Sequence, residues 1–212
     1  MEEETSHIVY SVNVIEFVTV ANEFCATLEN LEELNRSDFV HKMQKIFPLL
    51  YLKASLLPEV ENMLEDELER FVTEEDYNYL QRKLQVKLGE HDAYLEVFDP
   101  LMQYSEDPVE GSIAENMADI YQDLKDFILS YRIGTVEVMN DALWACRNNF
   151  AEYWGQRLVN GLRALHNLVF GGVDLSEDAD KKNSVEDDED DDKQIDSPDW
   201  ILKQQFKNFR GE

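Results

Sequence analysis

The connection at positions 89–111 holds the side chains best suited to bind a cation. Its candidate ligands are Glu90, His91, Asp92, Glu96 and Asp99. Carboxylate oxygens bind hard divalent cations, and a histidine nitrogen suits softer ones, but the spacing here matches no fixed pattern such as an EF-hand loop. Two other interpretations stay open. The connection could form a partner surface, or its aromatic rings could simply cover one end of the domain.

A row of four carboxylates follows this connection: Glu115, Asp119, Asp123 and Asp126. On a helix they fall within about 80° of one another, and about 130° from the centre of the apolar stripe. The row could bind a divalent cation, dock a basic partner, or form the solvated face of a very acidic protein. We predict that Glu115, Asp119 and Asp123 contact a partner.

The spacing of the remaining reactive residues supports neither covalent catalysis nor a built-in metal centre. The sequence contains no Gly-x-Ser-x-Gly motif and no phosphate-cradling loop. Two cysteines, Cys25 and Cys146, and four scattered histidines give no zinc spacing. The paired Glu-x-x-His motifs of di-iron bundles are missing. The sequence therefore predicts no catalytic residue, no cofactor and no tightly held metal, and an enzyme is the less favoured interpretation.

The segment 198–210 has the pattern of a short amphipathic docking helix. Ser197 can cap it, and Pro198 suits its first position. Ile201, Leu202, Phe206 and Phe209 share one broad apolar face with Trp200 at its edge, and the predicted anchors are Trp200, Leu202, Phe206 and Phe209. Lysine and arginine residues lie opposite them, as in helices that bind in a groove. Two interpretations stay open. The helix could dock in a groove of a partner, or it could dock on the chain's own helical domain.

Apolar residues spaced by three and four predict the helices that must position these groups. Such stripes run through residues 10–31, 39–50, 113–131 and 136–165. Thr73 with Asp76 forms a capping box that predicts a further helix ending at Leu88. Short connections between long amphipathic helices favour antiparallel neighbours. We therefore predict an all-α, up-and-down bundle of five or six helices.

Caps and prolines refine these boundaries. We expect Ser37 to cap the second helix and Pro48 to kink it or end it early. Pro58 is expected to start a short helical segment that extends to Val72. Arg147 falls inside the apolar stripe of the last helix, where a guanidinium needs a carboxylate partner. It could be an anion receptor or one half of a structural ion pair.

Charge and composition divide the chain into three parts. The 212 residues carry 46 acidic and 19 basic side chains, for a net charge of -27. Positions 174–197 hold 12 Asp and Glu but few large apolar residues, which is typical of disorder. We predict a helical bundle domain at 1–173, a disordered acidic linker at 174–197 and the C-terminal helix within 198–212.

The same charge limits the classes of partner. Phosphates repel so acidic a chain, so direct binding to nucleic acid or to an anionic membrane is not expected. The N-terminus is acidic where a signal peptide needs basic residues, and no apolar run approaches a membrane span. A cytoplasmic protein is expected. Its oligomeric state is not predicted.

The run LGEHDAYLEVFDPLMQYSEDPVEGSIAENMADIYQDLKDFI, with the ending from Trp200 to Phe209, resembles a bacterial family described only as a domain of unknown function. The resemblance spans nearly the whole chain. That family has no assigned activity, so the resemblance implies no catalytic residues. Its genes tend to lie beside genes for a 3′–5′ exonuclease and an RNA methyltransferase, which implies a loose link to RNA metabolism.

Three hypotheses follow. The favoured one is a non-catalytic acidic interaction module that binds a basic protein partner. The alternatives are a metal-dependent hydrolase that uses carboxylates of residues 89–126, and an acidic nucleic-acid mimic. Carboxylates that converge in a pocket would favour the hydrolase, whereas carboxylates spread over a convex surface would favour the module or the mimic.

Overall fold

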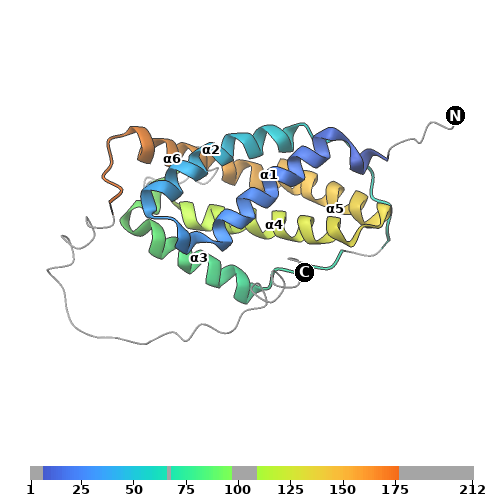
Figure 1. The fold of residues 1–212 in the computed structure, drawn as a ribbon, viewed down its shortest axis with the longest axis horizontal. Helices are drawn as coiled ribbons and strands as arrows, with labels where there is room; N and C mark the ends of the chain where they lie inside the picture. The colour runs from blue at the N-terminus through green and yellow to red at the C-terminus, as the bar shows by residue number, and fades with distance from the viewer. Residues whose placement is uncertain (1–6, 66–67, 97–108, 177–212) are drawn as a thin grey trace. The chain divides into compact units, whose positions relative to one another are not determined.

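The computed structural model describes residues 7–65, 68–96 and 109–176, and within them the predicted all-α fold is confirmed (Figure 1). The helices are α1 (Val12–Glu29), α2 (Arg36–Ser55), α3 (Glu74–Leu88), α4 (Ile113–Ile133), α5 (Val136–Asn149) and α6 (Gly155–Phe170). One small antiparallel pair, β1 (Ala93–Leu95) with β2 (Glu110–Ser112), is the only sheet in this part of the chain. α4 lies at the centre, in contact with α1, α3, α5 and α6.

Local capping signals set most helix boundaries. Thr73 and Asp76 make both hydrogen bonds of the predicted capping box at the start of α3. The Ser112 hydroxyl accepts a hydrogen bond from the backbone N–H of Glu115, which begins α4. α4 ends at Gly134, whose φ of 85° is in the left-handed region that glycine adopts at no steric cost.

Two expectations for α2, the Ser37 cap and an early end at Pro48, were wrong. Asn35, rather than Ser37, caps the helix, and its side chain accepts from the backbone N–H of Asp38. α2 also continues through Pro48 to Ser55. Pro48 lies on the exposed side of the helix, where water can satisfy the carbonyl that loses its donor.

An extended strap stands where a short helix was predicted after Pro58. We use the name strap for residues 57–65 and 68–72, which connect α2 to α3 along the side of α4 and α5 (Figure 1). Leu57 and Val72 at its two ends are buried in the core. The helix prediction failed because side chains of α4 and α5 take up the strap's backbone N–H groups, so tertiary contacts override local propensity.

The last long helix is continuous but not uniform. The predicted helix of about 35 residues is present as α5, a π-helical turn (Phe150–Trp154) and α6. A Cβ atom at Gly155 would lie 2.4 Å from the Phe150 carbonyl oxygen. Glycine at this position therefore lets the widened turn close. π-turns occur frequently at functional sites.

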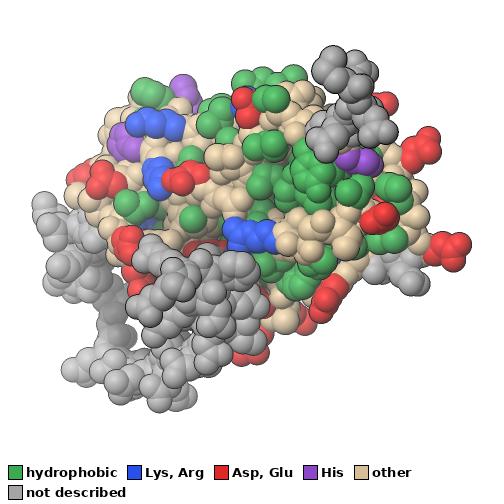
Figure 2. Space-filling model, turned by 45° about the vertical axis from the view of Figure 1, so that its right-hand side comes forward, with side chains coloured by type: hydrophobic (Ala, Val, Ile, Leu, Met, Phe, Trp, Pro, Cys, Tyr) green, Lys and Arg blue, Asp and Glu red, His purple; other side chains and the backbone are tan. Residues whose placement is uncertain are grey.

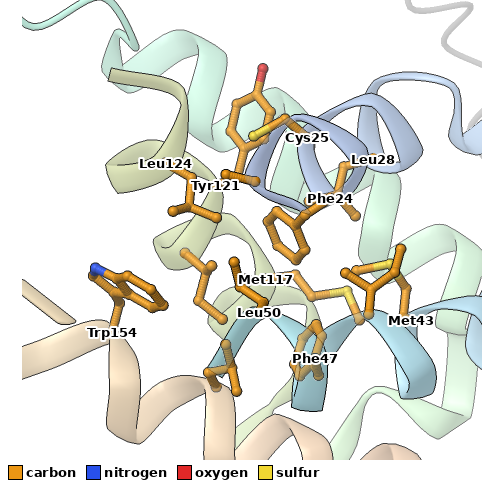
Figure 3. Packing of buried hydrophobic residues seen from close by; sticks show 14 of the residues in the cluster. Phe24, Cys25, Leu28, Met43, Phe47, Leu50, Met117, Tyr121, Leu124 and Trp154 are labelled. Atoms are coloured by element: carbon orange, nitrogen blue, oxygen red, sulfur yellow. The ribbon is translucent and has the colours of Figure 1, made fainter. Parts of the chain in front are cut away.

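Aromatic and aliphatic side chains from every α-helix form one core. Figure 3 shows the part of it where side chains of α1, α2 and α4 meet Trp154. Phe24, Phe47 and Trp154 are fully buried, and the Phe24 and Phe47 ring centroids lie 6.0 Å apart. The core also encloses an ion pair. Glu29 accepts hydrogen bonds from Lys125 Nζ at 2.7 Å and from the Tyr121 hydroxyl at 2.9 Å.

Part of the surface is apolar. Val12 and Ile15 on α1 and Leu52 on α2 are half or more exposed. A bridge between Lys53 and Glu16 holds these two helix segments side by side. Figure 2 shows hydrophobic side chains gathered over one part of the surface, with acidic side chains around them. The described surface therefore carries exposed apolar area as well as charge.

Leu175, expected in the linker, is buried against the core of the helical domain. The rest of the predicted linker from residue 177 and the whole C-terminal segment lie outside the described residues. Among the helices that are described, none is both long and apolar enough to cross a membrane.

Candidate functional site

Three of the four carboxylates of the α4 row, Asp119, Asp123 and Asp126, accept hydrogen bonds from neighbouring parts of the domain. Asp119 is 8% exposed, and Glu115, Asp123 and Asp126 are partly buried. The interpretation as a solvated face is therefore wrong for these three acceptors, most clearly for Asp119, whereas Glu115 is partly exposed. The row is covered because α3, the strap and the α5–α6 helix pack against this side of α4 as well.

Asp119 is held by three donors. The Tyr77 hydroxyl donates to Oδ1 and the Tyr153 hydroxyl to Oδ2, both at 2.8 Å, and Arg157 Nε lies 3.5 Å from Oδ2. Burial, followed by the hydrogen bond to Asp119, raises the pKa of Tyr153 to about 12. Both tyrosines therefore stay protonated donors at neutral pH. These contacts join α3, the π-helical turn and α6 to α4. Both carboxylate oxygens of Asp119 already have partners, which leaves little room for a ligand.

A second polar cluster joins β1 to α4 and α6. Glu96 accepts from the Tyr94 hydroxyl at 2.7 Å and from Asn160 at 2.7 Å. Asn116 in turn donates to the Tyr94 hydroxyl at 2.6 Å. A Cβ atom at Gly111 would lie 2.6 Å from the Tyr94 ring, so glycine on β2 is needed for this close packing.

The residues predicted as metal ligands mostly have other partners. Asp92 accepts from the Ser112 hydroxyl and from the Ala114 N–H, so it caps α4. Glu96 belongs to the tyrosine–asparagine cluster. His91 Nε2 lies 3.9 Å from a Glu90 oxygen. Asp99 lies outside the described residues. Across the described ranges, no group of three or more His, Cys, Asp or Glu side chains could hold a metal ion.

A cleft of about 450 Å³ lies between the strap and the α4–α5 pair. Its lining includes five carboxylates: Glu65, Glu69, Asp123, Asp126 and Asp141. Arg70 is the one cationic side chain among the described lining residues. Trp144, Phe127 and Cys146 add an apolar wall. The volume is within the range typical of ligand pockets.

Two aspartates fasten the strap over this cleft. Asp141 accepts from the backbone N–H of Met63 on Oδ1 and of Leu64 on Oδ2, each at 2.8 Å. Asp126 Oδ1 accepts from the N–H groups of Phe71 and Val72 at 2.8 and 2.9 Å. These bonds satisfy the strap's backbone donors without a helix or a sheet.

Asp123, one turn before Asp126 on α4, is the unusual carboxylate of the cleft. Its Oδ1 accepts from Asn149 Nδ2 at 2.6 Å. Burial raises the pKa of Asp123 to about 6. The charges of Asp126 and Asp119 add to this shift, while the Asn149 hydrogen bond and Arg70 oppose it. Asp123 is thus a partly buried carboxylate that a further cation would stabilise.

Sequence reasoning found some of the cleft residues and missed others. Asp123 and Asp126 belong to the predicted row. Asp141 was missed because it lies about 180° from the apolar stripe of its helix, on the side expected to face solvent. Glu65 and Glu69 were assigned to a helix that is absent. For Arg147, predicted as either an anion receptor or one half of a structural ion pair, the structure shows the ion pair. Its Nη2 atom lies 2.7 Å from a carboxylate oxygen of Glu59 on the strap, and its side chain is about a third exposed.

The fold and site define a class, an α-helical domain with an acid-lined cleft under an extended strap. The model of a family described as a domain of unknown function (DUF5063) matches residues 8–171. The chain belongs to this family, which confirms the predicted resemblance. It is 48% identical to protein BF1032 from Bacteroides fragilis, a crystal structure, with a TM-score of 0.70. That match covers 77% of this chain and 96% of the other. No curated protein gives a match.

Proposed function

We propose that the chain is a non-catalytic interaction module, and that its cleft receives a lysine or arginine side chain of a basic protein partner. The observation that carries this proposal is the concentration of five carboxylates beside one guanidinium in the described lining of the cleft. A bound cation would approach Asp123 and the free oxygen of Asp126. Trp144 on the wall can add a cation–π contact, because the face of an indole ring attracts cations.

The other two hypotheses receive less support. A hydrolase would need carboxylates grouped around a metal, and the cleft aspartates instead hold backbone N–H groups and Asn149. A nucleic-acid mimic would need carboxylates spread on a convex surface, and Asp119, Asp123 and Asp126 of the α4 row instead accept hydrogen bonds within the domain. The link to RNA metabolism stays a proposal based on family resemblance, in which the basic partner is a nucleic-acid enzyme.

A direct test uses decalysine as the probe and calorimetry on the full chain at low salt. We expect Asp123→Asn to weaken binding about tenfold, because it removes the carboxylate nearest to the bound cation. Glu137→Gln is the matched control. Glu137 is exposed in the first turn of α5, and its substitution changes net charge equally. Equal loss in the two variants would show nonspecific attraction to an acidic protein and contradict the proposal.

The predicted anchors of residues 198–210 are proposed as a second contact with the partner. Phe206→Asp is expected to abolish partner capture in affinity purification from native cells, because burial of a Phe contributes about 1.5–3 kcal/mol and an aspartate cannot replace it. Gln204→Asp, predicted on the face opposite Leu202, Phe206 and Phe209, is the control with the same charge change. Identical partners for both variants would remove this segment from the proposal. Altered quenching of Trp200 without any partner would support self-docking instead.

A further inference from the structure

We propose that strap residues 59–65 form a lid over the cleft, and that this lid opens locally while the rest of the domain stays folded. The inference rests on the proposed function in one respect, since a lid matters only if the cleft admits a ligand. Its structural basis is independent of the ligand. It comes from how this stretch is held and from what lies beneath it.

The lid is attached mainly by polar contacts. Asp141 binds the Met63 and Leu64 N–H groups, and Asn140 Nδ2 donates to the Glu61 carbonyl at 2.7 Å. The bridge between Glu59 and Arg147 joins the lid to α5. All these contacts come from one helix, so their loss would release the stretch as a unit.

Few side chains of the lid contribute to the core. Val60 is partly buried against the core, but Met63 is 53% exposed, and Glu59, Glu61, Asn62 and Glu65 are exposed as well. The buried side chains Leu57 and Val72 lie outside the lid, at the two ends of the strap. A segment with little apolar burial between fixed ends opens at a small fraction of the cost of global unfolding. Ligand-binding loops commonly have this property.

The cleft beneath the lid contains a built-in reporter. Cys146 is 3% exposed and lines the cleft, whereas Cys25, also 3% exposed, lies on α1. The sequence has only these two cysteines. Burial raises the pKa of both thiols, so neither reacts while it is covered. Lid opening would expose Cys146, and global unfolding would expose both.

The test labels the full chain with iodoacetamide under native conditions and quantifies both thiols by peptide mass spectrometry. We expect Cys146 to react faster than Cys25. Asp141→Asn should accelerate Cys146 about tenfold or more, because the new amide cannot accept both N–H groups. Glu137→Gln on the same helix should leave the rate unchanged. Equal rates for the two thiols in the unaltered chain, or no acceleration by Asp141→Asn, would overturn the lid.

Hydrogen exchange of the unaltered chain keeps the proposal testable if Asp141→Asn fails to fold. The amides of Met63 and Leu64 should exchange at least 100-fold faster than those of Leu124 and Leu143 in the core, and without dependence on low denaturant concentrations. Exchange of all four only through global unfolding would overturn the lid. Binding of decalysine is measured separately, so the lid and the proposed function can fail independently.

Discussion

Asp119→Ala is expected to lower the free energy of unfolding by about 3 kcal/mol or more, measured by urea denaturation. The substitution removes the acceptor of Tyr77 and Tyr153 and the charge beside Arg157. The two hydroxyls would then lie partly buried without this acceptor. The packing of α3 and α6 against α4 would weaken together, because these three donors come from α3, the π-helical turn and α6.

Glu115→Ala provides the control for this prediction. Glu115 lies one turn earlier on α4, is partly exposed, and carries the same charge. We expect a change of less than about 1 kcal/mol, as for most substitutions away from buried networks. An Asp119→Ala protein that kept its stability but lost partner binding would contradict this structural role and would restore Asp119 as a docking residue.

The fold was predictable where short segments determine it. The Thr73–Asp76 box, the Ser112 cap and the Gly134 stop each depend on residues within one turn of the chain, so the sequence shows them directly. The helical stripes likewise reflect burial on one face. Even the α4 row was found from spacing alone, although its burial was not.

The strap and the cleft could not be predicted in the same way, because contacts between residues distant in sequence create them. Met63 and Asp141 are 78 positions apart, and Phe71 and Asp126 are 55. Neither aspartate differs in sequence from an ordinary surface carboxylate. The two aspartates bind the strap only because the folded chain brings the strap against α4 and α5. The same packing forms the cleft.

The sequence also assigned the α4 row to one face without showing what covers it. A helix at the centre of a bundle is contacted on several sides, so a polar stripe opposite the apolar one can also be buried. Asp119 illustrates this, since its partners come from α3 and from the turn before α6. A row of carboxylates on a central helix therefore predicts an internal polar layer as readily as an acidic surface.

Asp123→Asn is expected to stabilise the domain at pH 8 by up to about 2 kcal/mol and to leave its stability near pH 4 almost unchanged. The folded-state pKa of Asp123, about 6, lies above the ordinary value of 3.8 because burial disfavours the charged form. Such a group contributes stability below its unfolded pKa, and this contribution is lost as pH rises through 6. Asparagine can still accept from Asn149 and carries no charge to penalise. Urea denaturation between pH 4 and 8 measures the difference.

The same carboxylate should make cation binding pH-dependent. In the unbound domain, burial and the charges of Asp119 and Asp126 disfavour the ionised form of Asp123. A bound lysine side chain would favour the ionised form, so binding should release a proton near pH 6. Decalysine affinity should therefore fall as pH drops from 7 to 5 in the unaltered chain and in Glu137→Gln, and stay nearly flat in Asp123→Asn. Asp123 would then lower stability at neutral pH and raise affinity for a cation, a combination that is typical of functional residues. If Asp123→Asn gained stability at pH 8 but bound decalysine with unchanged pH dependence, Asp123 would be a structural residue and the cation would bind elsewhere.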